Sequence, residues 1–390
     1  MNAYKKNIYL DYLHNFTRNF NLSHGVLLIY LAIKGFTFLE IGIVESIFHV
    51  TSLTMEIPTG ILADLLGRRL SRLLSVILYI AYLALLFFAT DLFMVSIAFA
   101  LCGLSYTLES GAGDALIYDS LIETKEESKY PRINSIKEII YQSSSLLALL
   151  IGGYLASINY DWVFIGSMFF GFAALIFVYK MKDPILETDN AHKPFLVRVK
   201  EQYVNSIKYI LTNKKLRFLV VMSSLFLFPV TVSFFYIQSL FTELGYSTTV
   251  IGIILALHSG FAILGALSVE KILKTFKERH ILIMIPLIEL ILIWMLTLEY
   301  SYVPFIILGG VESMFYVIML AYMNKIIPSN KRATILSMSN MVFSILMIAV
   351  FPVFGYIADI YSLKDGFIFN AIIVSVAYII YIINYRKLDA

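Results

Sequence analysis

Ionisable side chains fall inside long apolar stretches of the sequence, where a charge is costly, and seven of them lie where a site is expected. The seven are Arg18, Glu45, His49, Glu109, Asp114, His258 and Glu312. Carboxylates and histidines in such places can bind and release protons, and an arginine can hold an anionic group. Because surroundings of low dielectric disfavour a charged carboxylate, some of these residues are expected to carry protons. Each of the seven is therefore a candidate site for a proton or a small solute.

The elements that hold these residues are apolar runs. The 390 residues are 59% hydrophobic and 15% charged, whereas about a quarter of the residues in a soluble domain are charged. The runs are about 20 residues long, which matches a hydrocarbon layer of roughly 30 Å. Backbone groups inside a membrane must be paired within each span, so we expect helices. The composition predicts an all-α polytopic membrane protein.

Twelve membrane-spanning helices are predicted, and their approximate bounds follow. They are 7–32, 38–61, 71–90, 92–118, 132–157, 161–180, 216–241, 248–270, 280–298, 302–326, 332–358 and 364–384. Lysines and arginines gather in alternate connections, including Arg68, Arg69, Arg72, Lys125, Lys129, Arg132, Lys271, Lys274, Lys277 and Arg279. Such residues mark the cytoplasmic side. Both termini are therefore expected in the cytoplasm and the protein in the plasma membrane.

Three short repeats indicate two related halves. Gly35-Phe36-Thr37 recurs as Gly245-Tyr246-Ser247, Glu109-Ser110 as Glu312-Ser313, and Gly153-Tyr154-Leu155-Ala156 as Gly355-Tyr356-Ile357-Ala358. The shared offset of about half the chain predicts six-helix bundles at 1–180 and 216–390. The connection 181–215 carries an apolar stripe, Phe195, Val199, Tyr203, Ile207 and Leu211, beside basic residues. It predicts an amphipathic helix on the cytoplasmic leaflet, or else a solvated linker helix.

A charged turn between the second and third spans has the most specific local pattern. Gly60, Asp64, Gly67, Arg68 and Arg69 lie within ten residues. Glycines allow a tight reversal, and Asp64 lies within reach of Arg68, four residues later. Positive residues that merely set the orientation would not explain the Gly–Asp–Gly spacing.

This turn resembles the cytoplasmic signature of the major facilitator superfamily. The resemblance implies two six-helix bundles around a central cavity and alternating access. It also implies that Asp64 and Arg68, with Asp119, form a conformational latch. Leu65 departs from the family pattern, which often has a basic residue there. Thr107, Ala148 and Leu149 stand where proton-coupled exporters often carry Arg and Gly-Pro, so the resemblance supports the drug-exporter subgroup only weakly.

Arg18 shares a helix face with Asp11 and His14, and lies near the midplane. We expect Glu45 or Glu109 as its partner, either in a buried pair that only holds helices together or in a substrate site. His14 and Glu56 are expected near the interface, where they are solvated. Glu289 lies in the ninth span without a clear place in the site.

Asp114 and Asp119 also suggest the two half-motifs of an intramembrane aspartyl protease. That chemistry needs two carboxylates facing each other. Here they share one helix, about 140° apart at 100° per residue. The sequence also lacks a phosphate-binding glycine loop, an HExxH motif and a metal-ligand cluster. We therefore predict no enzyme activity, cofactor or metal.

The leading hypothesis is a secondary active transporter that exports small amphipathic or cationic compounds in exchange for protons, because the mid-membrane set is mostly acidic. The alternative is uptake or exchange of a small polar or anionic metabolite held by Arg18. A third possibility is a non-transporting receptor or lipid-handling relative on the same fold. The expected partners are a small-molecule substrate, H+ and the lipid bilayer, with no nucleic acid, and the expected state is a monomer.

Overall fold

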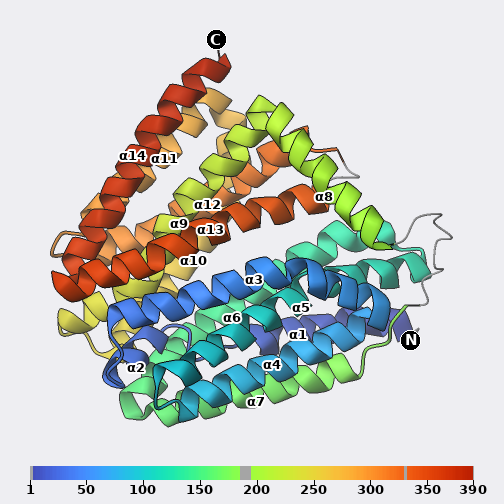
Figure 1. Cartoon of the computed structure of the whole chain (residues 1–390), viewed down its shortest axis with the longest axis horizontal. Helices are drawn as coiled ribbons and strands as arrows, with labels where there is room; N and C mark the ends of the chain where they lie inside the picture. Colours follow the sequence, from blue (N-terminus) through green and yellow to red (C-terminus); the bar gives the residue numbers. More distant parts are fainter. Residues whose placement is uncertain (1–2, 185–194, 329–331, 390) are drawn as a thin grey trace. The chain divides into compact units, whose positions relative to one another are not determined.

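The computed structural model describes residues 3–184, 195–328 and 332–389, and all the regular elements in these ranges are helices (Figure 1). The bounds of the elements follow in chain order. They are α1 (Ala3–Asn19), α2 (Leu27–Ile33), α3 (Phe38–Leu66), α4 (Arg68–Phe88), α5 (Leu92–Thr124), the 3-10 turn η1 (Glu127–Lys129), α6 (Tyr130–Ile158), α7 (Tyr160–Tyr179), α8 (Phe195–Thr212), α9 (Lys214–Glu243), α10 (Thr248–Thr275), α11 (Glu278–Met295), α12 (Tyr302–Ile326), α13 (Arg332–Ile360) and α14 (Leu363–Asp389).

Ten of the helices in the described residues are long and apolar enough to cross a membrane, and they correspond to ten of the predicted spans. The first predicted span is not one continuous helix. It is divided into α1 and α2, because the Asn21 side chain accepts hydrogen bonds from the backbone and hydroxyl of Ser23 and stabilises a turn. The ninth span is α11, which is 18 residues long and carries three charged residues, Glu278, Arg279 and Glu289.

Contacts divide the chain into two compact units. Unit 1 comprises Met1–Glu187 and Gln238–Ala256, and unit 2 comprises Thr188–Ile237 and Leu257–Ala390. The helix α8 lies in the predicted middle connection. Of its apolar stripe, Ile207 and Leu211 are exposed, and the side chains at 195–203 lie outside those described. The domain bounds drawn from the sequence stay a prediction.

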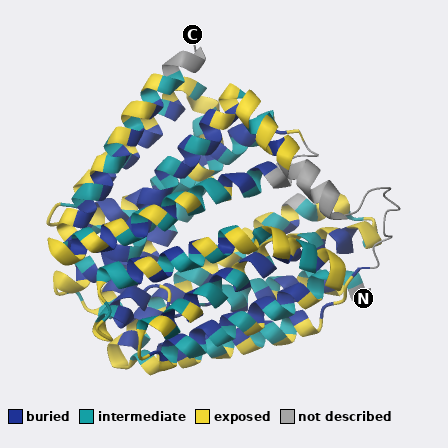
Figure 2. Ribbon diagram, in the orientation of Figure 1, coloured by how far each residue is buried: buried dark blue, intermediate teal, exposed yellow. Residues whose placement is uncertain are grey.

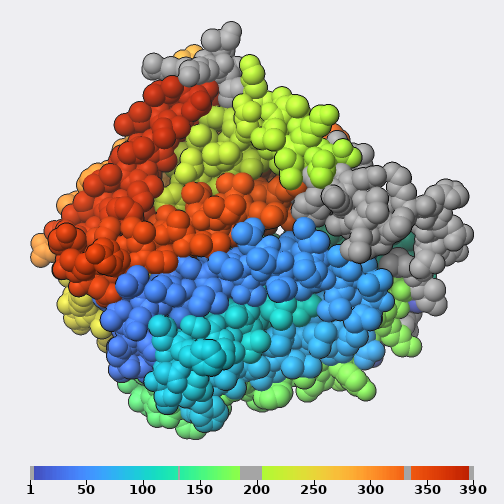
Figure 3. All heavy atoms as spheres, in the orientation of Figure 1, coloured from blue at the N-terminus to red at the C-terminus, as the bar shows by residue number. Residues whose placement is uncertain are grey.

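In unit 1, α5 packs against α3 and α4, while α7 packs against α1 and α4. The three helices α3, α4 and α5 form one continuous surface on the face drawn in Figure 3, and buried and exposed residues alternate along them (Figure 2). A side-chain carbon at Gly103 would lie 2.7 Å from the carbonyl oxygen of Phe48. The glycine therefore allows the α3 and α5 backbones to approach closely.

Reciprocal serine contacts fix the register of α4 against α5. The Ser75 hydroxyl donates to the carbonyl oxygen of Ser105 (2.7 Å), and the Ser105 hydroxyl donates to that of Ser75 (2.8 Å). One turn earlier in α4, Ser71 donates to the carbonyl oxygen of Leu108 at 2.7 Å. These bonds place Arg72, between the two serines, opposite Glu109.

Unit 2 uses the same kind of close helix contact. Between α10 and α12, a side chain at Gly265 would clash with the carbonyl of Gly310.

The repeated turns of the sequence match in structure: Gly35 has φ 93° and Gly245 has φ 84°. Each turn is followed by a capped helix, where Thr37 accepts from the backbone of Glu40 and Ser247 from that of Val250. The turns agree with two related halves.

Candidate functional site

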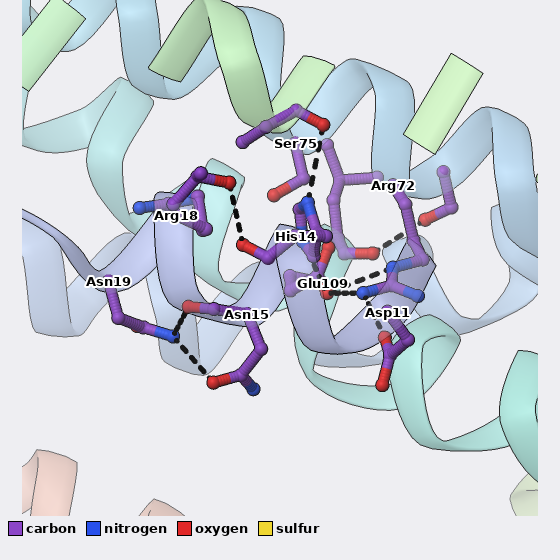
Figure 4. A network of polar contacts seen from close by, with 12 residues as sticks. Asp11, His14, Asn15, Arg18, Asn19, Arg72, Ser75 and Glu109 are labelled. Carbon is purple, nitrogen blue, oxygen red and sulfur yellow. Dashed lines mark hydrogen bonds and ion pairs between the residues drawn. The ribbon is translucent and has the colours of Figure 1, made fainter. Parts of the chain in front are cut away.

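A buried arginine on α4 organises the polar contacts of unit 1 (Figure 4). The Arg72 guanidinium is 1% exposed and points between two carboxylates. Its Nη2 lies 2.8 Å from Asp11 Oδ1 and 2.7 Å from Glu109 Oε1, and its Nε donates to the same Glu109 oxygen at 2.9 Å. The contacts join α1, α4 and α5 through one cation. Removing a single partner of such a group leaves an uncompensated buried charge.

His14 contacts this group from α1. Its Nε2 lies 3.2 Å from Glu109 Oε1, and its Nδ1 lies 3.5 Å from the carbonyl oxygen of Ala174 on α7. Both neighbours are acceptors, so a neutral ring, with one N–H, satisfies only one of them. A doubly protonated ring satisfies both.

Lys137 of α6 extends the network towards Asp114. Its Nζ lies 2.8 Å from Asp114 Oδ1 and 3.5 Å from Asp11 Oδ2. Unit 1 thus brings together three carboxylates, on Asp11, Glu109 and Asp114, with two basic side chains, Arg72 and Lys137.

Arg18 lies one turn further along α1 and has different surroundings. Its guanidinium carbon sits 3.5 Å from the centroid of the Tyr79 ring, and Nη2 donates to Ser105 Oγ at 2.9 Å. Nε is buried without a hydrogen-bond partner. Among the described residues, no carboxylate forms an ion pair with Arg18 within 4.0 Å. The expected partners, Glu45 and Glu109, do not pair with it, and Glu109 is taken by Arg72 and His14.

Glu45 and His49 lie on α3, apart from the Arg72 network. His49 is buried on the same helix face as Ser46 and Ser52. Glu45 is half-buried. Both Glu45 and Arg18 lie within electrostatic reach of Cys102 on α5. The structure thus places Glu45 in the surroundings of Arg18 without a direct ion pair.

In unit 2, three ionisable residues gather from α10, α11 and α12. His258 Nδ1 lies 2.8 Å from the carbonyl oxygen of Phe305, and Nε2 lies 3.9 Å from Glu312 Oε2. Glu289 is 0% exposed, neither carboxylate oxygen has a hydrogen-bond partner, and it interacts electrostatically with Glu312. Among the described ion pairs, neither glutamate has a lysine or arginine partner. This group therefore contrasts with the cation-rich network of unit 1.

The charged turn between α3 and α4 forms the contact between Asp64 and Arg68 that its spacing predicted and the contact with Asp119 that the resemblance implied. Arg68 Nη1 lies 2.8 Å from Asp64 Oδ1, and Arg68 Nε lies 3.6 Å from Asp119 Oδ2 on α5. Gly67, with φ 99°, ends α3 in a conformation that favours glycine. A side-chain carbon at Gly60 would meet nothing within 4 Å, so close packing does not explain that glycine.

Asp183 adds a contact that the sequence did not suggest. Its Oδ1 accepts a hydrogen bond from the backbone N–H of Arg69 at 2.8 Å, at the start of α4. The Arg69 side chain in turn donates to the carbonyl oxygen of Tyr179. The turn is therefore tied to the end of α7 as well as to α5.

Between α5 and η1, hydrogen bonds from Lys129 and Lys5 hold the pKa of Glu126 below its ordinary value.

Comparison with known proteins agrees with this architecture. The family model of the Major Facilitator Superfamily matches residues 15–352. The chain belongs to the Major Facilitator Superfamily. An uncharacterized MFS-type transporter of Bacillus subtilis (strain 168), YxaM, is 25% identical over 375 residues, which are 91% of this chain and 90% of the relative.

Solved structures of the superfamily share the fold. The nucleoside transporter NupG has a TM-score of 0.79 at 14% identity and covers 99% of both chains. A D-xylose-proton symporter has a TM-score of 0.72 at 13% identity, covering 97% of each chain. At such identities the likeness shows the fold alone. Membership in the superfamily makes the chain a multi-pass secondary transporter with the all-α, twelve-span architecture, and not an enzyme.

Superfamily membership agrees with the rejection of the protease alternative. Asp114 and Asp119 lie on the same helix, α5, and have separate partners, Lys137 and Arg68. The expectation for His14 is wrong, because it is 1% exposed and paired with Glu109 rather than solvated near the interface. Its neighbours on α5 and α7 cover it, which spacing along α1 cannot reveal.

Five residues of the polar groups were not assigned to a site from the sequence: Asp11, His14, Arg72, Lys137 and Glu289. Arg72 was counted with the loop residues Arg68 and Arg69, although it lies one helical turn beyond Arg68 and so deeper in the span. Lys137 and Glu289 fall inside predicted spans. Their position alone was a signal, because ionisable residues in spans are functional candidates.

Proposed function

We propose that the protein is a proton-coupled secondary transporter of a small polar solute. One observation carries the proposal: Glu289 is fully buried and neither of its carboxylate oxygens has a partner. An ion in such surroundings is disfavoured by several kcal/mol. A proton on Glu289 removes that cost. Glu289 therefore binds a proton in the state that the structure describes.

Glu312 and His258 supply a route for exchanging this proton. The Glu312 side chain is 28% exposed, unlike Glu289, and His258 Nε2 lies 3.9 Å from its Oε2. Glu312, which is partly exposed, can contact water, whereas the buried Glu289 cannot. Loss of the proton leaves negative charges on both Glu289 and Glu312 without a fixed cation nearby, which disfavours the deprotonated state. Solute binding that changes the surroundings of these two glutamates also changes their affinity for the proton, so binding and proton release are linked.

The polar contacts of unit 1 favour a small polar solute over a cation. The hypothesis of cation export depended on an acidic mid-membrane set. Arg72 contacts Glu109 and Lys137 contacts Asp114, so two carboxylates of that set are paired with cations and the attraction for a cationic compound is reduced. Two structures that share the fold are a nucleoside transporter and a D-xylose-proton symporter, and both names describe polar solutes.

The positions of the basic residues support a plasma-membrane orientation with both termini in the cytoplasm. Arg68, Arg69 and Lys129 lie at helix ends of the predicted cytoplasmic side. Export and antiport stay predictions from the sequence.

Flux into proteoliposomes under an imposed pH gradient tests the proposal. A panel of nucleosides, pentoses, small organic anions and lipophilic cations is screened on the wild type. We expect a polar solute to accumulate only with the gradient. Glu289→Gln and Glu312→Gln are expected to keep exchange of that solute between its two sides and to lose accumulation at least ten-fold, since the amide carries no exchangeable proton.

Glu270→Gln is the matched control, because this glutamate on α10 is 80% exposed and pairs with Lys274. It is expected to accumulate solute as the wild type does. Flux indifferent to the gradient, or accumulation unchanged in both buried variants, contradicts proton coupling. Transport of the lipophilic cations alone contradicts the choice of a polar solute and favours the export hypothesis.

A further inference from the structure

Arg18 differs from Arg72 and Lys137, the two cations of the polar network in unit 1. Arg72 and Lys137 each contact two carboxylates. Arg18 contacts a tyrosine ring and a serine hydroxyl instead. An arginine stays charged at any pH that a cell meets. Its charge is therefore held inside a span without an ion-paired carboxylate among the described residues.

The surroundings hold the Arg18 guanidinium in one orientation. The face of Tyr79 packs against it at 3.5 Å, in a cation–π contact. Ser105 donates its own hydrogen to the carbonyl of Ser75, so its oxygen is free to accept from Arg18 Nη2. Both contacts come from helices that the serine bonds lock together. A fixed, planar cation with unused N–H groups is already arranged for a ligand.

We propose that Arg18 is an anion-binding subsite that takes a carboxylate group of the transported solute. A guanidinium matches a planar carboxylate through two parallel hydrogen bonds. Nε has no hydrogen-bond partner, and Nη2 donates to Ser105 Oγ. The inference rests on the proposed transport function and narrows its substrate class from polar solutes to organic anions.

The position of Glu45 decides whether a carboxylate ligand has a competitor at the subsite. It lies on α3 and shares the neighbourhood of Cys102 with Arg18, but it is not within ion-pair distance of Arg18. A carboxylate ligand at Arg18 therefore competes with no bound carboxylate. In the absence of a ligand, the Tyr79 ring and Ser105 provide only partial compensation for the charge.

Binding to the purified full-length protein in detergent tests this proposal without any gradient. The probes are two matched pairs, benzoate with benzamide and succinate with succinamide, and the readout is the shift in melting temperature with probe concentration at pH 7. We expect at least one carboxylate to stabilise the wild type and its neutral amide to have no effect. Stabilisation by a ligand follows from its preferential binding to the folded state.

Arg18→Met is expected to weaken carboxylate binding roughly 10- to 100-fold, the loss of a charge-assisted pair. Arg18→Lys keeps the charge but not the planar guanidinium group, so we expect its affinity for the carboxylate to lie between those of the wild type and Arg18→Met. This variant also tests the subsite if Arg18→Met does not fold. Lys274→Met, at an exposed cation of unit 2, is the control and is expected to bind as the wild type does.

Equal stabilisation by the acids and their amides, or by none of the four probes, overturns the anion subsite. So does wild-type affinity in both Arg18 variants. These outcomes are distinct from a failure of the proposed function. Proton-coupled flux of neutral solutes without carboxylate binding refutes the subsite alone, whereas carboxylate binding with flux indifferent to pH refutes the proton coupling alone.

Discussion

At the scale of single residues, Arg72 is the group on which the polar contacts of unit 1 depend. It is the side chain that contacts both Asp11 and Glu109, and it is buried between them. Its burial is a tertiary property. The sequence places it only one turn from two exposed-looking arginines, and nothing in its spacing names Asp11 as a partner 61 positions earlier.

Replacing Arg72 tests this dependence. Arg72→Ala leaves two buried carboxylates without their main cation, so we expect the protein to lose about 3–5 kcal/mol of stability. A melting curve of the purified protein measures the loss. Arg279→Ala removes an exposed arginine at the start of α11 and serves as the control. Equal melting temperatures in the two variants would show that Arg72 does not hold the network together.

Only some members of the candidate site were predictable from the sequence, and their pairing was not. Glu109, Asp114, His258 and Glu312 stand out because they are ionisable residues in apolar runs. Their contacts depend on which helix faces meet, and this information is absent from periodicity along one helix. Arg18 illustrates the limit, because its true neighbours, Tyr79 and Ser105, are uncharged and carry no signal in the sequence.

At the scale of elements, the turn between α3 and α4 joins three helices and the segment after α7. Asp64 and Asp119 both contact Arg68, and Asp183 binds the backbone at Arg69. In unit 2 the corresponding pair, Glu270 and Lys274, lies on one exposed helix face and joins nothing else among the described contacts. The latch proposed for this turn is therefore confined to the first half.

Disrupting the turn is expected to change transport more than binding. Asp64→Asn removes one charge of the pair while the side chain keeps its size. We expect the transport rate in proteoliposomes to fall about five-fold or more, which is the range of a coupling free energy of 1–3 kcal/mol. Solute affinity measured in detergent is expected to stay within two-fold of the wild type, roughly 0.4 kcal/mol.

Glu270→Gln again provides the comparison, at the equivalent place in the second half. Wild-type flux in Asp64→Asn would reduce the turn to a signal for membrane orientation. An equal effect of both variants would contradict the asymmetry between the halves.

At the scale of the whole molecule, the fold followed closely from the sequence. Apolar runs of membrane length indicated the spans, and the short repeats indicated two halves. Both are local patterns that are visible in the sequence without knowledge of tertiary contacts. The break between α1 and α2 was missed, since it depends on side-chain bonds at Asn21 that interrupt an otherwise apolar run. The short, charged α11 was located from its apolar residues, and Glu289 was placed in it but not assigned to the site.

The proposed mechanism requires the molecule to hold a proton on Glu289 and to release it during transport. Infrared difference spectroscopy of the purified protein in lipid tests this requirement, with Glu289→Gln as the reference. At neutral pH, we expect the wild type to show the carbonyl band of a protonated carboxylic acid, Glu289→Gln to lack this band, and a transported solute to change it. A wild-type spectrum with only carboxylate bands at this position, unchanged by solute, would show that Glu289 does not carry the proton.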